Sequence, residues 1–251
     1  MKTEKIINGI KIFNYGITDS TNQRAKEYAT GENPHFPAVF IAEEQSAGRG
    51  RRGRSFDSAR GGGLYISFLF RTEKGFDAAE ITFGAAVKLC RVIESVSGLK
   101  PGIKWVNDIF VGGKKLAGIL AEGAGLDLKC AICGIGINLY HREFPGELAD
   151  IATTLEGECG RRVDKELFAK RLIEEFFKPE VREEMLEEYR SRSVVIGKRV
   201  EVRKILGEIY SATVLEIADD GALVVERDGG VRERLISAEV SVKTKESEED
   251  K

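Results

Sequence analysis

The sequence contains little cysteine and histidine, no long apolar run and almost no net charge. Four cysteines among 251 residues are too few for a disulfide scaffold, which favours a cytoplasmic protein. The apolar stretches end well before the ~20 residues that a membrane span needs, and the N-terminal residues lack the apolar segment of a secretory signal. A net charge of −2 excludes a basic coat over the whole surface but permits a local basic patch.

The hydrophobic pattern predicts an α+β fold in two domains. Residues 1–190 are expected to form a mixed β-sheet with packed helices, residues 191–243 a small β-barrel and residues 244–251 a charged tail. The predicted elements are a helix beginning in 18–28, strands 37–43 and 64–70, a helix 77–96, a strand–hairpin–strand 103–122, a strand 129–139, and a helix from 164 to about 190. Short β-rich runs follow at 198–204, 208–217, 222–228 and 231–236.

The most distinctive segment lies between Ser46 and Phe56. It has no acidic residue and carries three glycines and four arginines, namely Gly48, Gly50, Gly53, Arg49, Arg51, Arg52 and Arg54. Guanidinium groups match phosphate and carboxylate oxygens in pairs, and glycines let backbone amides surround an anion. The segment therefore indicates an anion clamp, although a solvated surface loop has the same composition.

The glycine spacing Gly48-x-Gly50-x-x-Gly53 also matches the dinucleotide-binding pattern as a string of letters. That pattern requires a helix to open at the third glycine. Here the chain continues into Gly61-Gly62-Gly63 and a predicted strand, so the match fails. No Walker motif, no Ser/His/Asp arrangement and no metal-ligand cluster is found, and the Cys130-x-x-Cys133 pair lies on a predicted strand, whose residues i and i+3 face opposite sides.

Five motifs occur in an order that resembles the biotin protein ligase family. They are Asp19-Ser20-Thr21-Asn22, the basic segment 48–54, Lys104-Trp105-Val106-Asn107-Asp108, the segment 115–120 (KLAGIL) and the segment 134–138 (GIGIN). Val106 stands where that family usually has proline, and Phe56 where a tryptophan often follows the basic loop. The resemblance implies an SH3-like C-terminal barrel and the short form without an N-terminal helix-turn-helix, so we expect no operator-type DNA binding.

The resemblance implies a two-step ATP-dependent ligase. Biotin's carboxylate attacks the α-phosphate of ATP, which enters with Mg²⁺, and biotinyl-5′-AMP and pyrophosphate form. A lysine of a biotin carboxyl carrier domain then attacks this mixed anhydride. An anion must approach a polyanion in the first step, so cations must stabilise the charge on the transferring group. Short-form relatives commonly pair into homodimers, which we expect here too.

The resemblance also assigns roles to individual residues. It implies Lys104 and Arg49 as catalytic residues. Biotin contacts are expected from Ser20, Thr21, Asn22, Gln45, Gly48, Arg49, Gly50, Arg51, Lys104, Gly118 and Gly136, and ATP contacts from Arg51, Arg52, Arg54, Phe56, Asn107 and Asn138. No residue is assigned as a metal ligand.

Several of these residues have a purely structural explanation as well. The Ser20–Gln23 spacing is that of a capping box, which by itself explains a serine there. Lys104 could face solvent from a strand, Gly118 and Gly136 could mark strand irregularities, and Asn107 could form a polar kink. Arg52 and Arg54 could contact the triphosphate or only water.

Two other functions compete with biotin ligation. A lipoate or octanoate ligase shares the acyl-adenylate logic, and Arg60-Gly61-Gly62-Gly63 superficially resembles the glycine run of that group. An Arg/Gly patch on a nucleic-acid-binding module is the second, but this segment lacks interleaved aromatic residues. The motif at 104–108 and the basic loop favour biotin.

Overall fold

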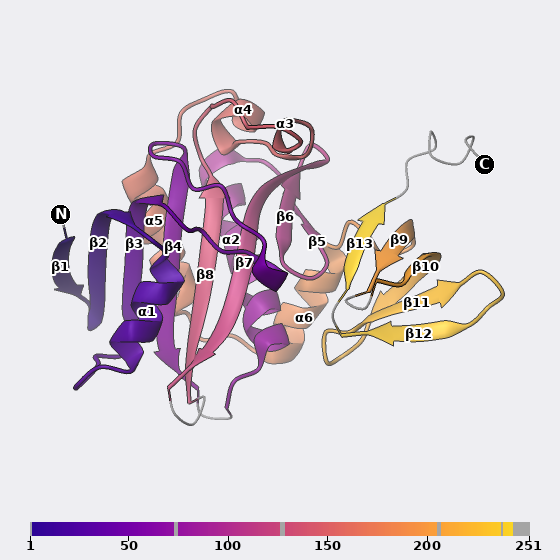
Figure 1. The fold of residues 1–251 in the computed structure, drawn as a ribbon, viewed down its shortest axis with the longest axis horizontal. Coiled ribbons are helices and arrows are strands. Elements are labelled where there is room, and N and C mark those ends of the chain that lie inside the picture. The colour runs from indigo at the N-terminus through magenta and orange to yellow at the C-terminus, as the bar shows by residue number, and fades with distance from the viewer. Residues whose placement is uncertain (1, 73–74, 126–128, 205–206, 237, 243–251) are drawn as a thin grey trace.

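The computed structural model describes residues 2–72, 75–125, 129–204, 207–236 and 238–242. An eight-stranded mixed sheet forms the larger part, with strand order β1-β2-β3-β4-β8-β7-β6-β5 (Figure 1). Its strands are β1 (Lys2–Ile7), β2 (Ile10–Thr18), β3 (Ala38–Gln45), β4 (Gly63–Arg71), β5 (Gly102–Lys104), β6 (Asp108–Val111), β7 (Lys114–Ala124) and β8 (Cys130–Asn138). The expected α+β fold is confirmed.

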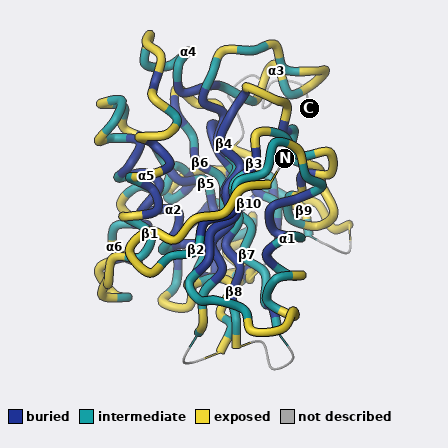
Figure 2. The backbone as a smooth tube through the Cα atoms, turned by 90° about the vertical axis from the view of Figure 1, so that its left-hand side faces the viewer, coloured by how far each residue is buried: buried dark blue, intermediate teal, exposed yellow. Residues whose placement is uncertain are grey.

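The first two strands were not expected from the hydrophobic pattern. β1 and β2 pair in antiparallel fashion around Asn8 and Gly9, both of which have positive φ. An Asn-Gly pair between apolar residues is the usual sequence signal for such a hairpin. All six residues of β1 are exposed at the edge of the sheet (Figure 2).

Helix α1 (Thr21–Ala29) crosses from β2 to β3, which are the one parallel pair of neighbours in this sheet among the described residues. Parallel strands need such a crossover. Ser20 occupies the N-cap position with extended backbone, but its side chain makes no capping hydrogen bond. The capping box expected at Ser20 and Gln23 is therefore not formed, and the helix ends at Ala29 with Thr30 as C-cap, before Gly31.

The opposite face of the sheet packs against helix α2 (Ala78–Ser97), which confirms the expected helix at 77–96. Asp77 caps its N-terminus by accepting from the backbone N–H groups of Ala79 and Glu80 at 2.9 and 3.0 Å. Gly98 ends it with φ of 77°. The buried residues of α2, among them Leu89 and Ile93, belong to a single large apolar core.

The helix expected from 164 to 190 is two helices. α5 (Lys165–Phe176) and α6 (Arg182–Ser191) are separated by a segment containing Pro179, which cannot continue a helix. The buried Lys88 ammonium donates to the carbonyls of Phe176 and Lys178 at 2.8 and 2.7 Å, so it completes the end of α5. The short helices α3 (Leu148–Ile151) and α4 (Leu155–Cys159) precede them. Residues 141–147, before α3, form the polar loop that the sequence suggests after the strand 129–139.

The strand expected over 103–111 is interrupted at residues 105–107, and the Trp105–Val106 peptide bond is cis. The extended backbone expected at Val106 is therefore wrong. Two buried groups hold this turn: the Tyr189 hydroxyl donates to Val106 O at 2.8 Å, and the Trp105 indole donates to Gly221 O at 2.9 Å. The turn thereby links the larger sheet to the C-terminal part.

The C-terminal part is a separate antiparallel sheet of order β12-β11-β10-β9-β13. Its strands are β9 (Arg199–Arg203), β10 (Ile209–Ile217), β11 (Leu223–Arg227), β12 (Arg232–Leu235) and β13 (Glu239–Val242). The four expected runs are confirmed, and β13 is a fifth strand that pairs with β9. The charged tail expected at 244–251 lies outside the described residues.

A charge network on this sheet makes its stability pH-dependent. Burial favours a raised pKa for Glu233, but hydrogen bonds from Lys204, Tyr210 and Arg227 outweigh it and hold the pKa at about 2. We expect Glu233→Gln to lower the free energy of unfolding at neutral pH by roughly 1 kcal/mol. The difference should shrink as pH falls below about 4.5 towards 2 in urea titrations, because the carboxylate is then lost in the unfolded chain and finally in the folded one.

Candidate active site

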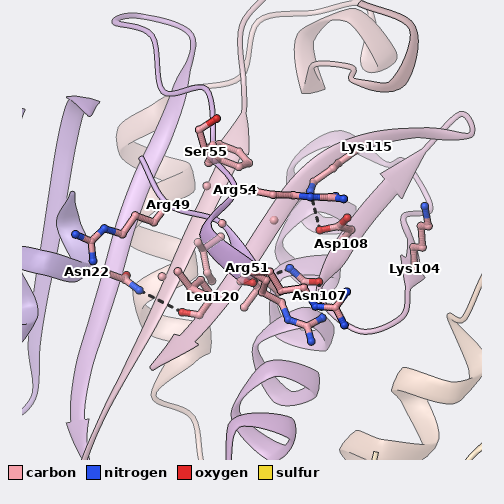
Figure 3. A pocket seen from close by; sticks show the side chains of 18 of the residues that line it. Asn22, Arg49, Arg51, Arg54, Ser55, Lys104, Asn107, Asp108, Lys115 and Leu120 are labelled. Atoms are coloured by element: carbon pink, nitrogen blue, oxygen red, sulfur yellow. Dashed lines mark hydrogen bonds and ion pairs between the residues drawn. The ribbon is translucent and has the colours of Figure 1, made fainter. Parts of the chain in front are cut away.

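A cavity of about 190 Å³ lies where the basic loop, the start of α1, the middle of β7 and β8, the 104–108 turn and β13 meet (Figure 3). Fourteen of the predicted site residues line it: Ser20, Thr21, Asn22, Gln45, Arg49, Gly50, Arg51, Arg52, Arg54, Phe56, Lys104, Asn107, Gly118 and Gly136. Gly48 and Asn138 do not. Segments from Ser20 to Gly136, and residues of the C-terminal sheet, therefore share one site.

The basic loop has a defined shape. The Phe56 N–H donates to Gly48 O at 2.9 Å, and the Gly50 N–H donates to Arg54 O at 2.7 Å. Between them Arg51–Gly53 forms one 3₁₀ turn, with φ of 57° at Arg52 and 73° at Gly53. The loop is thus a closed hairpin-like turn that presents its guanidinium groups to the cavity.

Gly48 supports the loop from behind and does not line the cavity. A Cβ on Gly48 would lie 2.4 Å from the backbone oxygen of Phe56 and 2.5 Å from Ser58 Oγ. Phe56 O belongs to the backbone, so it cannot move away as easily as the end of a flexible side chain. The glycine is required for close packing of the two loop arms.

We expect Gly48→Ala to displace the basic loop and to raise the KM for biotin by at least about tenfold, because a shift of ~1 Å in a positioning element is enough to cost that much. Steady-state kinetics with biotin varied would measure it. Gly53→Ala offers a contrast, since no atom lies within 4 Å of its Cβ position and only its positive φ opposes the change. Equal kinetics for Gly48→Ala and the wild type would contradict this role.

Cationic groups dominate one part of the cavity. Burial lowers the pKa of Lys104, and Asp108 opposes that shift. Burial and then the neighbouring Arg52 lower the pKa of Arg51. Both shifts have the sign expected of cations that are partly withdrawn from water, and a part of the cavity lined by several cations favours an anion.

The polar contacts of the turn hold these cations in place. Arg51 Nη1 donates to Asn107 Oδ1 at 3.3 Å, and Asn107 Nδ2 donates to Ile119 O at 2.9 Å. Lys115 and Asp108 form an ion pair at 2.8 Å. Lys115 and Asp108 also line the cavity, which the sequence analysis did not predict, although they lie within the KLAGIL and KWVND segments.

The C-terminal sheet also contributes to the site. Residues 238–241 line the cavity, and the Glu239 carboxylate pairs with the Arg54 guanidinium. The sequence pattern did not indicate this contribution, because the fifth strand was not recognised. Arg54 is thereby fixed to the C-terminal sheet as well as to its own loop.

Figure 3 shows Arg49 beside Asn22, on the opposite side of the cavity from Lys104. The Lys104 ammonium lies 5.3 Å from the centre of the Phe110 ring. Arg49 and Lys104 were both expected to contact biotin, and in this structure they lie on different sides of the cavity. We call this arrangement of the two cations open.

Gly118 and Gly136 were expected to give clearance to a ligand. Here they give clearance to Phe56: a Cβ on Gly136 would lie 2.5 Å from the Phe56 ring, and one on Gly118 3.4 Å from it. The ring also contacts Tyr65 edge-on, with centroids 6.4 Å apart. Phe56 therefore covers the glycine surface of β7 and β8 in this arrangement.

The start of α1 and the end of β3 form a second, polar end of the cavity, built from the side chains of Ser20, Thr21, Asn22 and Gln45. The Thr21 N–H donates to Gln45 Oε1 at 2.8 Å, and Asn22 Nδ2 donates to Glu122 Oε2 at 2.8 Å. These residues offer both donors and acceptors within a small space. That end suits a compact polar group, while the arginines and Lys104 suit an anion.

No group of three or more His, Cys, Asp or Glu side chains within the described ranges could hold a metal ion. Among the same residues, no helix is long and apolar enough to cross a membrane.

Asn138 was expected near the nucleotide. It lies outside the cavity, and its Oδ1 accepts from Arg142 Nη2 at 3.4 Å.

Comparison with known proteins decides the family. Residues 15–138 match the model of the biotin/lipoate A/B protein ligase family, and residues 195–243 match that of the biotin protein ligase C-terminal domain. The bifunctional ligase/repressor BirA of Bacillus subtilis is 32% identical over 96% of this chain and 76% of its own length. The chain belongs to the biotin protein ligase family.

Other biotin protein ligases match over nearly their whole length. The biotin–[acetyl-CoA-carboxylase] ligase of Paracoccus denitrificans is 31% identical over 89% of this chain and 97% of its own. The structure of the Aquifex aeolicus biotin protein ligase in complex with biotin and ATP covers 92% of this chain and 98% of its own, with 27% identity and a TM-score of 0.78. The resemblance seen in the five motifs and the predicted biotin ligase activity are confirmed.

Proposed function

We propose that the enzyme forms biotinyl-5′-AMP in the cavity and then transfers biotin to a lysine of a biotin carboxyl carrier domain. One observation carries the proposal: a polar end at the start of α1 and a cationic part at Arg51 and Lys104 lie in one cavity. Biotin combines a ureido ring with a carboxylate, so it fits such a cavity with its ring at the first end and its carboxylate towards the cations. ATP bound at the cationic part places its phosphates beside that carboxylate.

In this proposal Lys104 stabilises charge between the biotin carboxylate and the α-phosphate. Arg51 and Asn107 hold the phosphates, and Arg52 and Arg54 serve the rest of the triphosphate. Mg²⁺ enters with ATP and neutralises part of its charge. Arg49 moves in from the side of Asn22 when the loop closes over the carboxylate and phosphate.

Loop closure has a second purpose. A mixed anhydride hydrolyses readily, so a closed loop that excludes water preserves the adenylate until the acceptor lysine arrives. The Arg54–Glu239 ion pair supports this proposal, because it connects the loop to the C-terminal sheet at the rim of the cavity.

We propose the division between the two domains at about residue 191, where α6 ends.

We further propose that the enzyme is cytoplasmic, forms a homodimer and does not bind operator DNA. The exposed edge strand β1 supports the homodimer, since its outer backbone groups could pair with the same strand of a second copy. Light scattering should then give twice the mass of the 27.7 kDa chain. A sequence-specific gel shift would contradict the absence of DNA binding.

Thermal melting with biotin, and separately with lipoate, distinguishes biotin ligation from the other activity of the matched family model. We expect biotin to raise the melting temperature and lipoate to have no effect, because lipoate has no ureido ring to fill the polar end. Incubation with ATP and a biotin carboxyl carrier domain should then label one lysine of that domain with biotin. Stabilisation by lipoate together with labelling by lipoate would favour the alternative function.

A further inference from the structure

A fully buried hydroxyl lies directly beneath the polar end of the cavity. Ser67 is on β4 and is 0% exposed. Its Oγ lies 2.6 Å from Asn22 Oδ1 and 2.7 Å from Thr21 Oγ1. Ser67 does not line the cavity itself, but both of its partners do.

The carboxylate of Glu122 determines the orientation of the Asn22 amide. Glu122 is paired with Lys26 at 2.6 Å through one oxygen, and its other oxygen lies 2.8 Å from Asn22 Nδ2. A carboxylate only accepts hydrogen bonds, so the nitrogen of Asn22 must face Glu122. The amide oxygen of Asn22 must then face Ser67.

This orientation determines where the next protons lie. An amide oxygen only accepts, so the single hydroxyl proton of Ser67 is donated to Asn22. In the short contact between Ser67 and Thr21, the oxygen of Ser67 is then the acceptor and Thr21 the donor. Thr21 Oγ1 also lies 3.1 Å from Gln45 Oε1, which accepts the Thr21 backbone N–H at 2.8 Å and is a second acceptor for the hydroxyl inside the protein.

The Thr21 hydroxyl therefore donates its proton to an acceptor inside the protein, and only its oxygen lone pairs face the cavity. We propose that Ser67 is a positioning residue, which fixes Thr21 as a hydrogen-bond acceptor for a ureido N–H of biotin. This inference rests on the proposed function, because it requires the ureido ring to bind at the start of α1. Ser67 and Glu122 together then decide that the Thr21 hydroxyl accepts a hydrogen bond from the cavity and does not donate one.

Substitution of Ser67 by alanine tests the inference. Asn22 Oδ1 loses its donor, and the Thr21 proton loses its closer acceptor and is held only by the longer contact with Gln45 Oε1, so we expect the Kd for biotin to rise about tenfold. Desthiobiotin, which keeps the ureido ring and lacks the thioether, should lose the same factor. The Kd for ATP should stay unchanged, which a general loosening of the fold would not allow. Isothermal titration calorimetry measures all three.

Glu122→Gln is the second variant, and it leaves Ser67 and Thr21 intact. A glutamine can donate or accept, so it permits the Asn22 amide to turn over, and biotin should bind several-fold more weakly. Lys26→Met is the matched control: it removes the Lys26–Glu122 ion pair but retains the carboxylate as acceptor, so biotin binding should stay at the wild-type level.

Wild-type affinity for biotin in either Ser67→Ala or Glu122→Gln would overturn the inference, as would an equal loss of ATP affinity. Should Ser67→Ala not fold, the comparison of Glu122→Gln with Lys26→Met decides the question alone. A wild-type protein that fails to bind biotin at all would instead overturn the proposed function, and the inference with it.

Discussion

Replacing Lys104 by alanine slows biotinyl-AMP formation by about 100- to 1,000-fold, the range typical of losing one preorganised charge-stabilising group. The ammonium lies at the end of β5 in a partly buried position beside Asp108, where burial already lowers its pKa. The fold therefore holds the charged ammonium in a position where partial burial disfavours the charge. A bound carboxylate or phosphate offsets that desolvation cost. Pyrophosphate release under saturating biotin and ATP measures the loss.

The stability of the same variant separates catalysis from folding. Because the pKa of Lys104 is lowered in the folded protein, its charged form destabilises the fold at pH values below that lowered pKa. The penalty fades as pH rises through that pKa, so at lower pH the melting temperature of Lys104→Ala should equal or exceed that of the wild type. Lys114→Ala, an exposed lysine on the next hairpin, should leave both rate and stability unchanged. Near-normal pyrophosphate release by Lys104→Ala would contradict the assignment.

Replacing Arg49 by alanine accelerates release of biotinyl-AMP by about 10- to 100-fold, since one charge-assisted hydrogen bond contributes roughly 1.5–3 kcal/mol. In the open arrangement Arg49 lies beside Asn22 and away from Lys104 (Figure 3). Its contribution to binding is therefore made only after the loop closes. For this reason we expect the dissociation rate of the adenylate to change far more than the association rate of biotin.

Stopped-flow dissociation of biotinyl-AMP, followed by tryptophan fluorescence, measures this effect. The one tryptophan, Trp105, lines the cavity. Arg60→Ala is the matched control, because Arg60 is an exposed arginine a few residues beyond the loop that does not line the cavity. An unchanged dissociation rate for Arg49→Ala would contradict the role of the loop as a lid.

The sequence was informative where one local signal decides the structure. Asp77 and Gly98 bound α2 because a side-chain acceptor and a left-handed residue are the usual helix ends. Fourteen of the predicted site residues line the cavity, and most of them lie in the five motifs that carry the family resemblance. The hairpin at Asn8 and Gly9 had a recognisable signal that the apolar pattern alone did not use.

The rest depends on contacts between distant segments. The turn at Trp105 is held by Tyr189 and by Gly221, which lies more than 100 residues away, so a local pattern predicts a continuous strand there. The contribution of Glu239 needs the docking of a whole sheet. From the sequence alone, Ser67 is a polar residue in an apolar strand. Its role depends on its contacts with Thr21 and Asn22 of α1, which only the folded structure shows.

The most direct test is biotin-dependent exchange of labelled pyrophosphate into ATP. We expect exchange only when biotin is present, with wild-type rates for Lys114→Ala and Arg60→Ala and almost none for Lys104→Ala. Exchange that persists without biotin, or that survives in Lys104→Ala, would show that the cationic part of this cavity does not join biotin to the nucleotide.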